Sequence, residues 1–262
     1  MFYEVVGLQD STAPTVVLSS GLGGSGHFWE TLIPVLESSW RVIVYDHNGT
    51  GRSPASLPND YSIKSMSREL LALLNDIQIQ QCHFVGHALG GLVGLEIALQ
   101  RPEILQSLVL INAWSSPNPH TLRCFNIRKA LLHNCSADVY LQMQALMLYP
   151  PDWIAKNAEL LNVEEQHMLK NFPDKQNLLA RISALSQFDI DGQLNAIKAN
   201  TLIIANKDDA LVPWQRSAIL ADGIANSKLH IFEYGGHACT VTITDEFNQL
   251  LLEHLNHYLK GH

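Results

Sequence analysis

Two short segments near the carboxyl terminus contain the residues best suited to acid–base chemistry. Asp209 lies within the segment 206–213, and His237 directly follows Gly235 and Gly236. Each segment comes after an apolar, β-branched run of the kind that forms a buried strand. A carboxylate that holds a histidine ring fixes its tautomer and stabilises the ring when it takes up a proton. We therefore predict that Asp209 and His237 form a catalytic pair.

A third segment, residues 85–91, has the glycine pattern of a sharp turn between a strand and a helix. Its sequence is V-G-H-A-L-G-G, and it lies between the apolar runs 82–85 and 92–99. A strand that enters a helix through G-x-#-x-G resembles the nucleophile elbow of α/β-hydrolases, whose central residue attacks the substrate. The glycines are needed because such a turn leaves no room for Cβ atoms. Position 88 is alanine, which has no attacking atom, so we predict an elbow whose nucleophile position is vacant.

The order of these segments along the chain, elbow then acid then histidine, is that of the α/β-hydrolases. Asp209 lies four residues before Pro213, which fits the D-x-x-V-P pattern of that group, and Asp208 is the competing choice. A non-catalytic interpretation also exists, in which both aspartates cap the helix that follows Pro213. His237 would then be an ordinary turn residue.

A glycine-rich loop, S-G-L-G-G, follows the apolar run 15–19. It contains neither G-x-x-x-x-G-K-[ST] nor a dinucleotide-binding pattern, which argues against a phosphate cradle. We predict instead that the backbone N–H groups of Leu22 and Leu89 form an oxyanion hole, a function that needs no particular side chain.

Other oxygen and sulfur atoms near these segments are weaker candidates for a nucleophile. None of the serines in the first loop lies on the elbow, and Cys239 is expected to be a small packed residue. The serines are Ser19, Ser20 and Ser25.

Strand-like and helix-like runs alternate through most of the chain. Short apolar runs predict strands, and segments with 3.6-residue periodicity predict helices. The expected strands are 15–19, 41–45, 82–85, 107–111, 200–205 and 228–232, and the expected helices include 62–74, 92–99, 214–221 and 245–259. This alternation predicts an α/β fold, the α/β-hydrolase fold, with a mostly parallel sheet covered by helices on both faces.

Between residues 114 and 188 the strand-like runs disappear. Helical segments separated by prolines replace them, with prolines at 117, 119, 150, 151 and 173. We predict that 114–188 is a helical cap over the carboxyl ends of the strands, where open α/β sheets bind ligands. Residues 1–113 and 189–262 would then form the hydrolase core.

Composition excludes several classes of function. The chain has 262 residues, 47% of them hydrophobic, and 17 basic against 25 acidic residues give a formal charge of −8. We expect no nucleic-acid partner, because no basic patch is present. The four cysteines lack C-x-x-C spacing, and neither a signal peptide nor a membrane span is visible, so we predict a cytoplasmic protein without a membrane partner. No cluster has metal-ligand spacing, so we predict neither a metal nor a cofactor.

Over nearly its whole length the sequence resembles the α/β-hydrolase-fold proteins of the bacterial Rut pathway of pyrimidine utilisation, described as carbamate or aminoacrylate hydrolases. Alanine at position 88 matches that group. The resemblance implies a small, labile nitrogen compound of uracil catabolism as substrate. Residues 20–26, 45–46, 60–63, 85–90, 120–121, 123–125, 148–150, 152–153, 208–213 and 234–239 carry the resemblance.

Two residues of the predicted cap, His120 and Arg123, could contact a small anionic substrate. Arginine can grip a carboxylate through two parallel hydrogen bonds. The alternative is that His120 is a helix-end residue and Arg123 a surface charge.

Loss of the nucleophile limits the reactions that remain open. A serine hydrolase without its triad retains about 10³–10⁴-fold catalysis over water, which suits a substrate that decomposes unaided. We predict direct water attack or proton transfer on carbamate or aminoacrylate, without a covalent intermediate. The alternative is a catalytically silent hydrolase fold that binds or sequesters a small molecule, and a third option is an esterase scaffold that lacks only its serine.

The sequence is also compatible with a homodimer.

Overall fold

Seven strands form one sheet in a computed structural model that describes residues 1–259. The strand order is β1-β3-β2-β4-β5-β6-β7, and all neighbours are parallel except β1 with β3. The strands are β1 (Tyr3–Gly7), β2 (Thr15–Ser19), β3 (Arg41–Tyr45), β4 (Cys82–His87), β5 (Leu105–Ile111), β6 (Thr201–Asn206) and β7 (Ser227–Phe232). The predicted α/β-hydrolase fold, with its mostly parallel sheet, is thereby confirmed.

The central strands are buried on both faces, which explains their nearly continuous apolar sequences. Every residue of β2, β4 and β6 is buried. Successive side chains of a strand point to opposite faces, so Val17 packs in one hydrophobic cluster while Val16 and Leu18 pack in another. The sheet therefore separates two hydrophobic cores.

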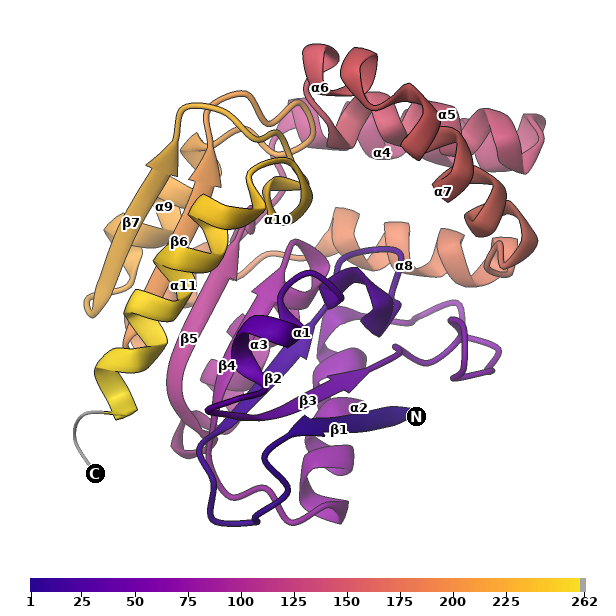
Figure 1. The fold of residues 1–262 in the computed structure, drawn as a ribbon. Coiled ribbons are helices and arrows are strands. Elements are labelled where there is room, and N and C mark those ends of the chain that lie inside the picture. The colour runs from indigo at the N-terminus through magenta and orange to yellow at the C-terminus, as the bar shows by residue number, and fades with distance from the viewer. Residues whose placement is uncertain (260–262) are drawn as a thin grey trace.

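Helices cover both of these cores. Helices α2, α3 and α9 lie on one face of the sheet, and α1 and α11 lie on the other (Figure 1). Their bounds are α1 (Ile33–Leu36), α2 (Ile63–Asp76), α3 (Leu89–Gln100), α9 (Gln215–Gly223), α10 (Cys239–Thr242) and α11 (Thr244–Leu259), and the 3₁₀ turns are η1 (Gly26–Trp29), η2 (Pro102–Ile104) and η3 (Asp191–Ala196). Within residues 1–259, no helix combines the length and the apolar composition that a membrane crossing needs.

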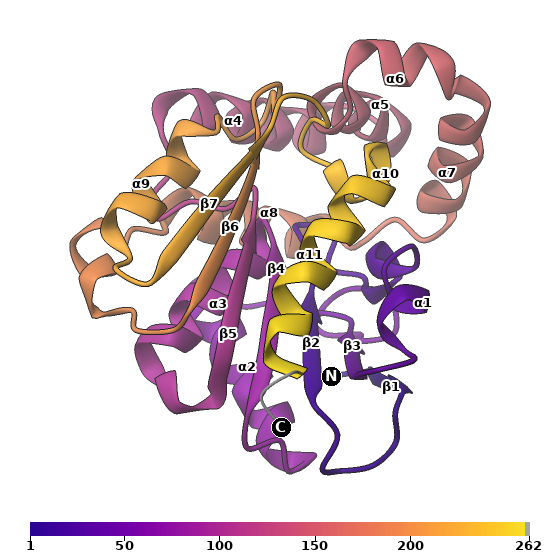
Figure 2. The same cartoon turned by 60° about the vertical axis from the view of Figure 1, so that its left-hand side comes forward.

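A layer of helices lies beyond the carboxyl ends of the strands (Figures 1 and 2). It consists of α4 (Pro119–Asn134), α5 (Ala137–Leu148), α6 (Pro151–Lys156), α7 (Ala158–Lys170) and α8 (Lys175–Gln187). We call α4–α8 the cap helices. The division of the chain at 113/114 and 188/189 into core and cap stays a prediction.

The first strand, β1, was not anticipated from the sequence. Its residues are exposed or only half-buried, and it pairs with β3 alone, in the antiparallel direction. An edge strand of this kind lacks the continuous apolar run by which the inner strands are recognised.

Replacing Gly90 with alanine is expected to destabilise the fold. A Cβ atom there would overlap the backbone carbonyl of Ser19 in β2, which has no freedom to move away. Overpacking a tight core costs about 1–3 kcal/mol, so urea unfolding of Gly90→Ala should show a loss of at least that size. Gly192→Ala is the matched control, because a Cβ atom there meets nothing within 4 Å. Equal effects at the two positions would contradict this account.

Candidate active site

The turn between β4 and α3 has the strained backbone of an elbow. Ala88 has φ 49° and ψ −112°, a conformation that residues with a Cβ atom rarely adopt. Its N–H donates to the Ile111 carbonyl at 2.8 Å. A Cβ atom on Gly86 would lie 2.5 Å from the backbone of Gly90, so only glycine permits the strand and the helix to approach this closely. Ala88 is 5% exposed, and its methyl group stands at the nucleophile position.

His237 and Asp209 lie in direct contact. The His237 Nδ1 is 2.7 Å from Asp209 Oδ2, and the two side chains are almost completely buried. The other carboxylate oxygen, Oδ1, accepts the N–H groups of Leu211 and Val212, each at 2.8 Å. Because an ionised carboxylate can only accept, this geometry places a proton on Nδ1 of His237. Its Nε2 bonds to none of the residues that the structure describes, so its lone pair is available for proton transfer.

Asp208, the competing acid, holds the backbone of the histidine loop instead. Its two carboxylate oxygens accept the N–H groups of Gly235 at 3.1 Å and Gly236 at 2.9 Å. These glycines have φ 138° and 64°, which side-chain-bearing residues rarely adopt. The two aspartates therefore have different contacts: Asp209 holds the ring of His237, and Asp208 holds the loop before it.

Two asparagines at strand ends also hold this loop, and sequence reasoning missed both. Asn112, just after β5, donates its side-chain N–H to the His237 carbonyl at 2.8 Å. Asn206, the last residue of β6, donates to the Tyr234 carbonyl at 3.0 Å. Each asparagine comes at the end of a buried apolar strand, which is a signal that the sequence does contain.

His87, inside the elbow, links the elbow to the histidine loop. Its Nε2 donates to the His237 carbonyl at 2.8 Å, and the rings of the two histidines lie 4.9 Å apart, centre to centre. Its ring also stacks on Phe28. Burial, together with the nearby His237, lowers the pKa of His87 to about 3, so its ring is neutral at physiological pH. His87, which directly precedes Ala88 in the chain, therefore connects the elbow to His237.

The first glycine-rich loop lies against the elbow. An ideal Cβ atom on Gly21 would be 3.7 Å from the Ala88 Cβ. The Gly21 carbonyl accepts the Gly24 N–H at 3.0 Å, and in a planar trans peptide the N–H of Leu22 points the opposite way. Among residues 1–259 this N–H donates no hydrogen bond. The N–H of Leu89, the first residue of α3, has no acceptor within its helix. Leu22, next to Gly21, and Leu89, next to Ala88, thus each have a backbone N–H without an acceptor in the described chain, and their role as an oxyanion hole stays a prediction.

Other side chains of the first loop and the histidine loop have structural contacts. Ser19 bonds to the Tyr45 hydroxyl at 2.7 Å, and Ser25 caps η1 by accepting the His27 N–H. Ser20 Oγ is buried and has no partner within the described chain. Burial raises the pKa of the Cys239 thiol far above neutral, so it remains protonated.

The two predicted substrate contacts in the cap have different surroundings. His120 is exposed and donates its Nε2–H to the Ala210 carbonyl at 2.8 Å, in the loop that carries Asp209. Arg123 is exposed on α4 and makes no ion pair or hydrogen bond with residues 1–259. Their predicted contact with substrate stays a prediction.

Cap helices contact each of the three loops around Ala88 by hydrogen bonds. Thr121 in α4 donates to the Leu211 carbonyl at 3.2 Å, in the acid loop. The carbonyl of Leu148, at the end of α5, accepts the Ala238 N–H at 3.0 Å. Arg181 in α8 donates to the Leu22 carbonyl at 3.5 Å. The cap therefore positions the site as well as covering it.

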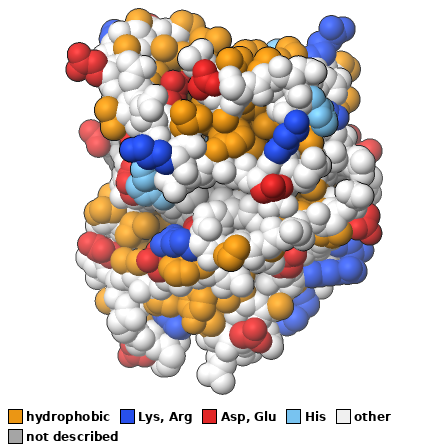
Figure 3. Space-filling model, turned by 90° about the vertical axis from the view of Figure 1, so that its right-hand side faces the viewer, with side chains coloured by type: hydrophobic (Ala, Val, Ile, Leu, Met, Phe, Trp, Pro, Cys, Tyr) orange, Lys and Arg blue, Asp and Glu red, His pale blue; other side chains and the backbone are white. Residues whose placement is uncertain are grey.

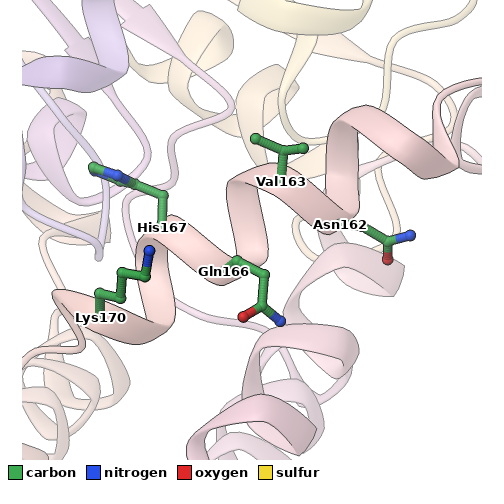
Figure 4. Close-up of a pocket in the computed structure, with 5 residues that line it drawn as sticks. All are labelled: Asn162, Val163, Gln166, His167 and Lys170. Atoms are coloured by element: carbon green, nitrogen blue, oxygen red, sulfur yellow. The ribbon is translucent and has the colours of Figure 1, made fainter.

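Two surface hollows lie apart from Ala88 and His237. A groove of about 900 Å³ lies between the core loops and α7–α8, and its lining includes Arg52, His167 and Asn177. A smaller pocket of about 430 Å³ is lined by residues 162–170 of α7 alone (Figure 4). Hydrophobic side chains gather on the upper part of one face, above a hollow that crosses it (Figure 3).

The described part of the chain contains no cluster of three His, Cys, Asp or Glu residues that could hold a metal ion.

Substitution of the two aspartates should separate their roles. In Asp209→Asn the amide can present its N–H₂ to the ring, which favours the other tautomer of His237. Asp208→Asn should leave the tautomer unchanged, because Asp208 contacts only the loop backbone, and should lower the free energy of unfolding by about 1–3 kcal/mol. Nitrogen-15 NMR of the imidazole and urea unfolding measure these two effects. A tautomer change in Asp208→Asn would refute the assignment.

Comparison with known proteins places these features in a family. The sequence profile of the family described as "alpha/beta hydrolase fold" matches residues 14–135. A protein of Pseudomonas savastanoi pv. phaseolicola named "Putative carbamate hydrolase RutD" is 57% identical, over 98% of this chain and 99% of that protein. A protein of Pantoea ananatis with the same name is 48% identical, over 97% of this chain and 93% of that protein.

Solved structures agree with this fold. A hydrolase from Pseudomonas aeruginosa PA01 superposes with a TM-score of 0.84 at 26% identity, covering 97% of this chain and 93% of that one. The enol-lactonase from Burkholderia xenovorans LB400 has a TM-score of 0.88 at 21% identity, with 97% and 96% covered, and shows the fold alone. The resemblance recognised in the sequence is confirmed, and the chain belongs to the RutD family of α/β-hydrolase-fold proteins.

Proposed function

We propose that this protein is a hydrolase that releases ammonia from a small, labile nitrogen-bearing carboxylate. Carbamate is the substrate we favour, and aminoacrylate is the alternative. The names of the relatives support the first choice. Both compounds fit a cytoplasmic enzyme of pyrimidine utilisation, the role implied by the sequence resemblance.

One observation carries this proposal: a buried histidine–aspartate pair lies beside an elbow that has a methyl group in place of a nucleophile. General acid–base catalysis contributes about 10²–10⁴-fold, and one oxyanion donor contributes roughly 2.7–4 kcal/mol. Enzymes that cleave unreactive bonds need barrier reductions of about 8–23 kcal/mol. The groups present therefore suit a substrate that already decomposes unaided.

For carbamate, the reaction needs a proton at nitrogen and no nucleophile. Protonated His237 donates its Nε2 proton to the carbamate nitrogen, and Asp209 stabilises the charged ring before the transfer. The C–N bond then breaks with its electron pair on nitrogen, which gives ammonia and carbon dioxide. The N–H groups of Leu22 and Leu89 hold a carboxylate oxygen during this step. His237 recovers its proton from water.

For aminoacrylate, neutral His237 acts first as a base. The enamine first takes a proton from water at carbon 2, which leaves an iminium at carbon 3. A second water, oriented by Nε2, adds at carbon 3 and gives one proton to His237, and His237 passes that proton to the nitrogen. The C–N bond breaks with its electron pair on nitrogen while the new hydroxyl loses its proton to the hydroxide left by the first step, which releases ammonia and malonic semialdehyde. Water occupies the room left by the small side chain of Ala88, so no covalent intermediate forms.

His237→Ala should reduce ammonia release from fresh carbamate about 10²-fold or more relative to the native protein, after subtraction of the spontaneous rate. The substitution removes the imidazole whose Nε2 transfers the proton to and from the substrate. Single-turnover ammonia measurement provides the readout, and His133→Ala, an exposed position on α4, is the control. A native protein that binds carbamate without raising the rate would instead indicate a silent, ligand-binding fold.

Ala88→Ser should gain hydrolysis of a chromogenic ester such as p-nitrophenyl acetate, by at least about tenfold over the native protein. The serine hydroxyl would lie beside His237 and the two backbone donors, so a working triad is restored. The double variant Ala88→Ser/His237→Ala is the control and should show no gain. If Ala88→Ser is as inactive as the native protein, Leu22, Leu89 and His237 are not directed at position 88.

A further inference from the structure

A buried arginine lies behind the oxyanion loop. Arg181, on cap helix α8, is completely buried. Its guanidinium donates to the carbonyls of Asn48 at 2.5 Å and Leu22 at 3.5 Å, while Nε has no partner within the described chain. Burial lowers the pKa of Arg181 to about 10, so the group stays charged at neutral pH.

No carboxylate pairs with this charge among residues 1–259, where every ion pair within 4.0 Å involves other residues. Glu69 forms no ion pair with Arg181 within 4.0 Å and attracts the guanidinium from farther away, while its carboxylate accepts the Tyr61 hydroxyl at 2.7 Å. Asp46 is already paired with Arg52. Buried charges are normally neutralised by a partner, because leaving water is costly for an ion. Arg181 is therefore a buried positive charge with no carboxylate in ion-pair contact among residues 1–259.

The charge lies against the loop that carries the proposed oxyanion donor, on the side away from Ala88. The Leu22 carbonyl that it binds belongs to the same residue as the proposed oxyanion donor. A Cβ atom on Gly24 would lie 2.9 Å from Arg181 Nη1, so the guanidinium packs directly under the loop. Water is excluded here, and in such surroundings a charge acts over several ångströms.

We propose that Arg181 makes this site selective for a substrate with a negative charge. The bound anion supplies the negative charge that the buried guanidinium lacks, with the oxyanion loop between them. This inference rests on the proposed function for the location of the site and assigns the preference for its anionic substrates to one residue. A neutral amide or ester of the same shape gains nothing from Arg181.

Acetate and acetamide are the probes that test this inference, since they match in size and differ in charge. The dissociation constants come from NMR titrations that follow the amide signals of Leu22 and Leu89. The native protein should bind acetate at least about tenfold more tightly than acetamide. That factor is the size expected for a unit charge roughly 10 Å away at an effective dielectric constant of about 20.

Arg181→Met should remove this preference by weakening acetate binding and leaving acetamide binding unchanged. Arg128→Met is the matched control, because Arg128 is also a buried arginine of the cap but bonds to Gln144 within the cap. It should retain the preference for acetate. If Arg181→Met does not fold, Arg181→Gln provides the same comparison with a polar side chain retained.

Several results would overturn the inference: equal binding of the two probes to the native protein, binding of neither, or a preference that survives in Arg181→Met and Arg181→Gln. An equal loss of both probes in the Arg181 variants would show a structural role alone. The Arg181 test measures binding of acetate and acetamide, whereas the proposed function is tested by ammonia release. One proposal can therefore fail while the other stands.

Discussion

The site depends on one close backbone approach, that of α3 to the strand β2. A Cβ atom on Gly90 would collide with the Ser19 carbonyl of β2, and one on Gly86 would collide with the backbone of Gly90 within the elbow itself. Ala88, between these two glycines, has the strained φ of 49° and ψ of −112°. The backbone turn of a nucleophile elbow is therefore retained although residue 88 has no attacking atom. Strain of this kind persists only where surrounding structure enforces it.

The position of His237 results from many contacts beyond its bond to Asp209. Its carbonyl accepts from both His87 and Asn112, and Asp208 holds the two glycines before it. These groups lie at the carboxyl ends of β4, β5 and β6, which meet at one edge of the parallel sheet. The parallel sheet thereby brings residues that are far apart in the sequence together around the His237 ring.

Much of the fold could be predicted from the sequence, because buried parallel strands and glycine-dependent turns leave strong local patterns. The juxtaposition of Asp209 and His237 followed from their order and from their places after strands. The function of Asp208 could not be distinguished in this way, since adjacent aspartates in a loop have equivalent sequence patterns and only the turn geometry separates them. Arg181 gave no signal either, because its neighbours Leu22 and Asn48 are more than 130 residues away and are contacted through backbone atoms.

The bonds from the cap helices to the acid loop, the histidine loop and the oxyanion loop have a consequence for movement of the cap. Moving the whole layer outward would break Thr121, Leu148 and Arg181 away from their partners together, and the reacting geometry would be lost with them. Outward movement of this layer is therefore coupled to the order of the three loops around Ala88. One layer of helices thus holds in place three loops that lie far apart in the sequence.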